Sequence, residues 1–256
     1  MEALAKKLVS VVTDYCIPRS RIDQASEHFN RTGSTEHFNA LQREAKSLFA
    51  DVDNSGEVGE LLIFLLLERL LGIPQVLCKM SLKTNPNVHF HGVDGVHVKA
   101  LTGGGLAIYW CESKIHGDFA EASRACLKSI APYLLDDGLG ATERDLTLLR
   151  TKLDSGDPAL DDLLVKYFVE DSIAVTKREF RGASLIGFAL DEYPDPGSPG
   201  AEIPDELQAK IESWFEAVAC RVQNEEVESI ELEVFCLPVP AVDEFRQAFR
   251  RQLRLA

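Results

Sequence analysis

Two stretches of alternating polar and apolar residues in the first half of the chain meet at three consecutive glycines that begin with Gly103. Glycine accepts the positive φ that a tight turn needs, so the pattern predicts an antiparallel hairpin. With the turn centred on Gly103, the numbers of facing residues sum to 206, which places Asp94 opposite Glu112. Their side chains would lie roughly 5 Å apart on one face of the hairpin. Lys114 would share that face, and Ser113 would point away from it.

The remaining apolar patterns predict an α/β protein in which helices cover a sheet. The segment from 57 to 71 is apolar nearly all round and is expected to be a buried helix. Strands are expected at 75–82, 182–191 and 229–237, besides the hairpin. Further helices are expected at 2–15, about 35–50, 118–135, 143–170, 205–223 and 241–254.

Composition places the chain among soluble globular proteins, because 45% of its 256 residues are hydrophobic and 27% are charged. The longest apolar run, Leu61 to Leu67, is far shorter than the ~18 residues of a membrane span. The N-terminus lacks the order of a signal peptide. Six scattered cysteines without a CxxC pair predict reduced thiols in a cytoplasmic protein and speak against a structural zinc site.

The net charge of −14 argues against a protein that binds nucleic acid through its overall field. The stretch from Val76 to Lys128 differs, because it carries six basic and four acidic side chains. A locally positive cleft in an acidic body is compatible with bound nucleic acid. It also suggests that a partner supplies much of the binding.

Two neighbouring carboxylates, Asp94 and Glu112, would repel each other, and burying them unpaired would cost several kcal/mol. A divalent cation between them removes that cost, so the hairpin predicts a metal site with Lys114 beside it. Glu60 lies on the core-facing stripe of the buried helix, where a carboxylate requires a cation. A Glu-x-Lys tripeptide alone is weak evidence, because a second one begins at Glu44 in a predicted helix.

The order Glu60, Asp94, Glu112-Ser113-Lys114 on helix, strand and strand resembles the PD-(D/E)xK nuclease superfamily. That resemblance implies a restriction-endonuclease-like core of a helix, a three-stranded meander, a helix and a further strand, covered by extra helices. The stretch from Gly59 through Glu-Ser-Lys is similar, more narrowly, to the HamA nuclease family of the Hachiman anti-phage system. The likeness covers residues 57–135 best, and Val93 replaces the proline of the superfamily motif.

The resemblance implies a metal-dependent DNA endonuclease or nickase that hydrolyses phosphodiester bonds as the effector of a defence complex. Asp94, Glu112, the Ser113 carbonyl and Glu60 would hold Mg²⁺, with Mn²⁺ as a substitute. Lys114 would orient the attacking water and offset the charge that develops on the phosphate. The implied partner is the helicase HamB, with DNA as the substrate and no membrane involved.

We divide the chain accordingly into three parts. Residues 1–55 would be a helical segment packed on the core. Residues 56–192 would be the nuclease core, with a helical insertion at about 136–172. Residues 193–256 would form a helix-strand-helix extension of the same domain.

The sequence offers further basic and histidine side chains beside the predicted site and in the last helix. Lys79, Lys83 and Lys99 are candidate DNA contacts, although a solvated surface would explain each equally well. The histidines that flank the site are left without a role; they are His89, His91, His97 and His116. In the last helix, Arg246, Arg250, Arg251 and Arg254 are interpreted as a solvated face rather than a docking stripe.

Two alternatives stay open. The same fold could be a DNA-binding or regulatory subunit without turnover. The segment from Asp51 to Glu57 is similar to the start of a calcium-binding EF-hand loop, but Leu62 occupies the twelfth position, where that loop needs a bidentate Glu. A helix cap formed by Asn54 with Glu57 would explain the same residues.

Overall fold

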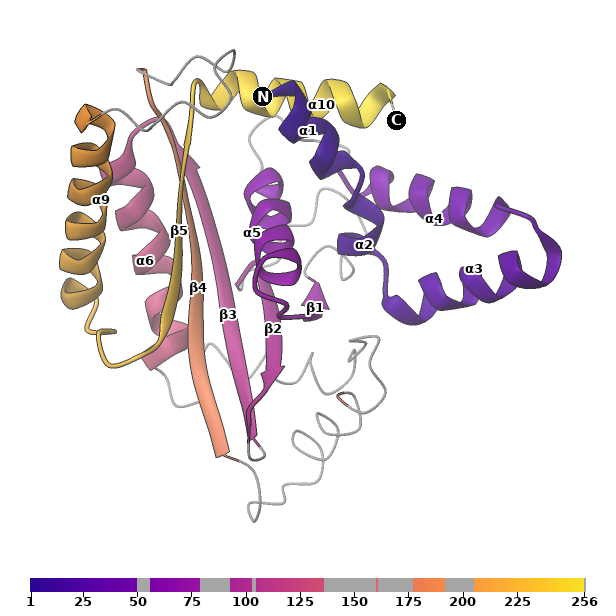
Figure 1. Cartoon of the computed structure of the whole chain (residues 1–256), viewed down its shortest axis with the longest axis horizontal. Coiled ribbons are helices and arrows are strands. Elements are labelled where there is room, and N and C mark those ends of the chain that lie inside the picture. The colour runs from indigo at the N-terminus through magenta and orange to yellow at the C-terminus, as the bar shows by residue number, and fades with distance from the viewer. Residues whose placement is uncertain are drawn as a thin grey trace.

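A five-stranded mixed sheet forms the centre of the molecule (Figure 1). The computed structural model describes residues 1–49, 56–78, 93–102, 105–135, 160, 177–191 and 205–255. The strands lie side by side in chain order. They are β1 (Gln75–Cys78), β2 (Gly95–Ala100), β3 (Gly105–His116), β4 (Lys177–Ala189) and β5 (Leu232–Val239).

The first three strands form an antiparallel meander, and β4 and β5 add to it in parallel. Every pair of facing residues from Gly95↔Cys111 to Ala100↔Leu106 obeys the predicted sum of 206. The predicted register is therefore confirmed, and so is the predicted α/β class. Antiparallel neighbours need only a short turn, whereas the parallel step from β3 to β4 requires a crossover, and helix α6 (Phe119–Leu135) lies within it.

Helices cover both faces of the sheet (Figure 1). Helix α5 (Glu57–Arg69) packs against β2, β3 and β4, while α6 packs against β3 and β4 from the opposite side. Helix α9 (Asp205–Asn224) lies outside α6. Helix α10 (Val242–Leu255) packs against α1 (Glu2–Val9), so the two ends of the chain meet. The predictions of α5, α6, α9 and α10 are confirmed.

The N-terminal part differs from the prediction. The helix expected at 2–15 is interrupted and continues as α2 (Val12–Cys16). The predicted α4 (Glu36–Ser47) is present, but α3 (Arg19–Thr32) before it was not expected. Ala25 is the buried residue of α3, so this helix lacks the apolar stripe from which a helix is recognised. It ends at Gly33, whose φ of 71° suits glycine. Figure 1 shows α3 and α4 as a hairpin that projects from the body.

Some expectations concern residues that the structure does not describe. The insertion at about 136–172 and the strand residues beyond 78 belong to these, and the three-part division of the chain stays a prediction. Strand β4 begins at Lys177, earlier than predicted. The prediction missed its first residues because they are charged and lack the apolar pattern that indicates a buried strand. None of the helices in the described ranges combines the length and the apolar character needed to cross a membrane.

Side-chain alternation along β3 divides the core into two layers. Tyr109 and Cys111 face the layer that contains α5, together with side chains of α1, α2, α4 and α10. Ile108 and Trp110 face the layer that contains α6. By this alternation Glu112 and Lys114 belong to the α6 side of β3, and Ser113 to the α5 side.

Helix α5 approaches β3 so closely that a glycine is required at the contact. A Cβ atom on Gly59 would lie 2.8 Å from the Oγ of Ser113 and 3.1 Å from its Cβ. Both atoms belong to a short side chain on a buried strand, so they have little room to move.

We expect Gly59→Ala to lower the free energy of unfolding by about 1–2 kcal/mol, because overpacking outweighs the gain of about 1 kcal/mol in helix propensity. Urea unfolding measures this. The matched control is Gly117→Ala, since nothing lies within 4 Å of a Cβ built there. A Gly59→Ala variant as stable as wild type would show that the helix and the strand are not in such close contact.

His97 is a core residue of β2, and it does not belong to the site. Its ring is buried, and Nδ1 donates a hydrogen bond to the carbonyl of Ile73 at 2.8 Å. Burial lowers the pKa of His97 to about 4, although the hydrogen bond to Ile73 opposes this shift. The imidazole is therefore neutral in the folded protein at neutral pH.

This burial predicts a loss of stability in acid. The unfolded chain takes up the proton near pH 6.5 and the folded chain only near pH 4, so stability falls as the pH decreases between these values. Between pH 7.5 and pH 5, wild type should lose about 2 kcal/mol more than His97→Gln, as judged by urea unfolding. Equal slopes for wild type and His97→Gln would contradict the assignment.

Candidate metal-dependent active site

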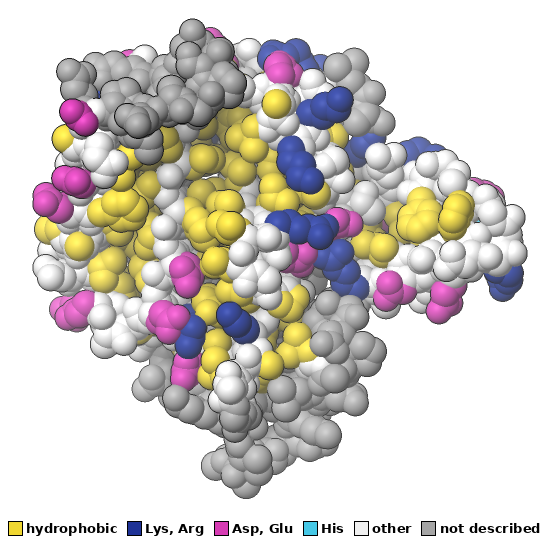
Figure 2. Space-filling view, in the orientation of Figure 1, with side chains coloured by type: hydrophobic (Ala, Val, Ile, Leu, Met, Phe, Trp, Pro, Cys, Tyr) yellow, Lys and Arg dark blue, Asp and Glu magenta, His cyan; other side chains and the backbone are white. Residues whose placement is uncertain are grey.

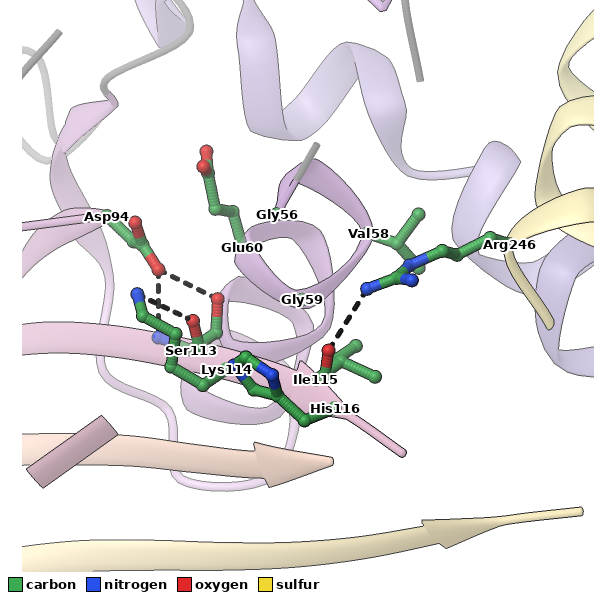
Figure 3. Close-up of a pocket in the computed structure, with 10 residues that line it drawn as sticks. All are labelled: Gly56, Val58, Gly59, Glu60, Asp94, Ser113, Lys114, Ile115, His116 and Arg246. Carbon is green, nitrogen blue, oxygen red and sulfur yellow. Dashed lines mark hydrogen bonds between the residues drawn. The ribbon is translucent and has the colours of Figure 1, made fainter. Parts of the chain in front are cut away.

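A pocket of about 330 Å³ opens where β3 ends, beside the first turns of α5 (Figure 3). Its walls come from α5, from the residue before β2, from the end of β3 and from α10. The lining residues are Gly56, Val58, Gly59, Glu60, Asp94, Ser113, Lys114, Ile115, His116 and Arg246. The predicted residues Glu60, Asp94, Ser113 and Lys114 thus meet here from segments far apart in the chain.

Asp94 lies one residue before β2 and is only 7% exposed. Its Oδ2 atom accepts hydrogen bonds from the backbone N–H of Ser113 at 2.8 Å and from the Ser113 hydroxyl at 2.7 Å. The expectation that Ser113 points away from the site is therefore wrong, and Asp94 forms its hydrogen bonds on the α5 side of β3, whereas Glu112 belongs to the α6 side. Asp94 stands outside the regular pleat, so its carboxylate can turn toward a side chain on the other face of β3 (Figure 3).

Glu112, the remaining predicted acid, does not line the pocket: it is only 2% exposed and forms an ion pair with Lys114. The pKa of Glu112 is raised to about 7, first by burial and then by the negative charge of Asp94, while Lys114 and a hydrogen bond from Ser129 oppose the shift. Burial lowers the pKa of Lys114, but the charge of Glu112 more than offsets this, so the amine stays protonated. Lys114 Nζ also donates to the carbonyl of Ser113 at 3.4 Å. Lys114 therefore links buried Glu112 to the pocket.

Glu60 reaches the pocket from the first turn of α5 (Figure 3). The hydroxyl of Tyr15, in the N-terminal segment, donates to its Oε2 at 3.1 Å. The Tyr15 ring packs on Phe64 of the same helix, with ring centroids 5.2 Å apart. The N-terminal segment thus orients one of the predicted acids, and no short sequence motif pointed to Tyr15.

The oxygen atoms around Asp94 are of the kind that a hard divalent cation prefers as ligands. The Asp94 carboxylate lies beside Ser113, and its charge is close enough to act on Glu112. Mg²⁺ favours one or two carboxylates with water and phosphate oxygens. Across the described part of the chain, no three or more His, Cys, Asp or Glu side chains lie close enough together to hold a metal ion. The three predicted acids Glu60, Asp94 and Glu112 therefore do not lie together as one set of metal ligands. A cation held by one or two carboxylates, with water or substrate oxygens as its other ligands, is what this donor chemistry could accommodate.

Several predicted contacts lie elsewhere. Lys99 is exposed on β2 and does not line the pocket. Lys79 and Lys83, His89 and His91, and residues 51–55 of the calcium-like segment fall outside the described residues.

Arg246 was missed by sequence reasoning. It belongs to α10, yet its guanidinium lines the pocket and donates to the carbonyl of Ile115 at 3.0 Å. The interpretation of this arginine as part of a solvated face is wrong, because α10 lies against the end of β3. His116 also lines the pocket, with Nδ1 located 3.6 Å from Glu121.

Comparison with known proteins gives one match. A family model, HamA, matches residues 1–253. No curated protein and no solved structure matches the chain. A match over essentially the whole chain identifies the family, and we conclude that the chain belongs to the HamA family.

Proposed function

We propose that the chain is a Mg²⁺-dependent deoxyribonuclease, an endonuclease or nickase, of the PD-(D/E)xK type. It would serve as the effector of a Hachiman anti-phage pair whose other member is the helicase HamB. The observation that carries the proposal is the burial of Asp94 and Glu112 near each other, with Lys114 as their neighbouring cation.

The charges of the buried side chains support a bound cation beside Asp94. With both carboxylates ionised, one ammonium group would leave a net negative charge in a largely buried place; burial and the charge of Asp94 accordingly raise the pKa of Glu112. A divalent ion bound by Asp94, Glu112 and the Ser113 carbonyl would offset it. Bound Mg²⁺ would lower the pKa of a coordinated water and neutralise charge on the phosphate.

The chain's own groups would divide the remaining work. Ser113 holds the carboxylate of Asp94 through two hydrogen bonds, which fixes a ligand before substrate arrives. Lys114 would orient the attacking water and stabilise the negative charge that grows on the phosphate oxygens. Glu60, held by Tyr15, would complete the metal's shell or bind its water ligands.

The surface charge supports a role for a partner. In Figure 2 acidic side chains gather along the edge formed by α9, and basic side chains lie mainly over α10 and the neighbouring helices. With a net charge of −14, the chain alone would bind DNA weakly. A helicase that presents DNA to the pocket would supply the missing affinity.

One observation favours the alternative of a DNA-binding or regulatory subunit without turnover. Asp94 is engaged by Ser113, and Lys114 is engaged by Glu112, so the groups needed for catalysis already bind each other. A silent subunit would retain such contacts permanently, whereas a nuclease must exchange them for metal and substrate.

Plasmid cleavage tests the proposal. Glu112→Gln, Lys114→Ala and Asp94→Asn should each lower Mg²⁺-dependent cleavage at least 100-fold, because each removes charge stabilisation at the reacting phosphate. Cleavage is measured with the chain alone and with HamB and ATP, in Mg²⁺ and in Mn²⁺. The loss should appear as fewer nicked and linear plasmids on a gel.

The second Glu-x-Lys tripeptide provides a matched control. Glu44 forms an exposed ion pair with Arg21 on the projecting hairpin, so Glu44→Gln should cleave like wild type. Melting temperatures establish that each variant is folded. Equal cleavage by wild type and the three site variants would contradict the proposal. Inactivity of wild type under every condition would favour a regulatory subunit without turnover.

A further inference from the structure

Arg246 comes from the last helix of the chain, yet it is fixed at the end of β3. Its guanidinium donates to the Ile115 carbonyl, one residue beyond the Glu112-Ser113-Lys114 motif. The helix that carries it is held firmly, because Phe245 and Phe249 on its inner face are fully buried. The arginine is therefore placed relative to the motif by a backbone contact and a rigid helix.

The pocket has two chemically different ends (Figure 3). Glu60, Asp94 and the Lys114 amine lie at one end. The Arg246 guanidinium lies at the other, beside Ile115 and His116. A ligand that fills this pocket would meet a metal-binding end and a cationic end.

The guanidinium of Arg246 has donors available for a ligand. A guanidinium carries five N–H groups, and among the described residues Arg246 uses one Nη2 donor for the Ile115 carbonyl and one Nη1 donor for Asp243 at 3.4 Å. Asp243 is 88% exposed, so that ion pair is a weak one. The Arg246 side chain itself is only 23% exposed, which strengthens its hydrogen bonds to an anion.

We propose that Arg246 binds a DNA backbone phosphate next to the one that is cleaved. This proposal rests on the nuclease function proposed above. DNA carries a phosphate at every nucleotide, so a strand whose scissile phosphate lies at the Asp94 end extends a neighbouring phosphate along the pocket. The planar guanidinium fork matches phosphate oxygens in pairs. Arg246 is thus a positioning residue that holds the strand in line with the metal-binding end.

Three variants separate phosphate binding from a merely structural role. Arg246→Gln keeps an amide donor for the Ile115 carbonyl but loses the charge. Arg246→Lys keeps the charge but loses the paired donors. Arg254→Ala is the matched control, because it removes the same charge from an exposed position of the same helix.

Fluorescence anisotropy with a labelled short DNA duplex in EDTA measures binding without turnover. Arg246→Gln should weaken binding about tenfold, the effect of one charge-assisted contact. Its slope of log Kd against log salt concentration should fall by about 1, because one phosphate contact is lost. Arg246→Lys should keep the slope with an intermediate affinity. Arg254→Ala should bind like wild type, and all melting temperatures should agree.

Cleavage kinetics provide the second readout. Arg246→Gln should raise KM about tenfold and change kcat much less, since the contact is present before and during the reaction. If wild type cleaves DNA and Arg246→Gln matches it in KM and in salt slope, the assignment to Arg246 is wrong while the nuclease function stands. If wild type neither binds nor cleaves DNA with HamB and ATP present, the proposed function fails and this proposal fails with it.

Discussion

The burial of two neighbouring carboxylates is the constraint on which the rest of this structure depends. Asp94 and Glu112 are both nearly inaccessible, and each needs compensation for the lost hydration. Ser113 provides it for Asp94 through two hydrogen bonds, and Lys114 provides it for Glu112 through an ion pair. Helix α5 approaches β3 closely at Gly59, and helix α6 covers the opposite face of the strand.

Residues near both ends of the chain position parts of the site that the central hairpin carries. Tyr15 of the N-terminal segment holds Glu60, and Arg246 of the last helix holds the end of β3 at Ile115. The first and last helices also pack against each other, and Arg251 forms an ion pair with Glu2. The match to the HamA family over residues 1–253 agrees with a site assembled from the whole chain. Substitutions in the first or last helices should therefore alter the arrangement of the pocket residues.

The hairpin was predictable because local rules determine it. A glycine turn fixes the register, and the period of two along a strand fixes which side chains share a face. The same rules failed at Ser113, since Asp94 lies just before the regular strand. They also missed α3, whose residues leave only Ala25 buried and give no apolar stripe. The contact of Arg246 with Ile115 could not be predicted, because the two residues are 131 positions apart and no local pattern encodes such a pairing.

Metal binding, measured without substrate, tests the central claim most directly. Isothermal titration calorimetry of the chain with Mn²⁺ reports the affinity of the pocket independently of DNA, helicase and turnover. The account predicts saturable binding in wild type that weakens at least about tenfold in both Asp94→Asn and Glu112→Gln, because each loses one of the two carboxylate ligands. Binding of the same affinity in wild type and both variants would contradict it.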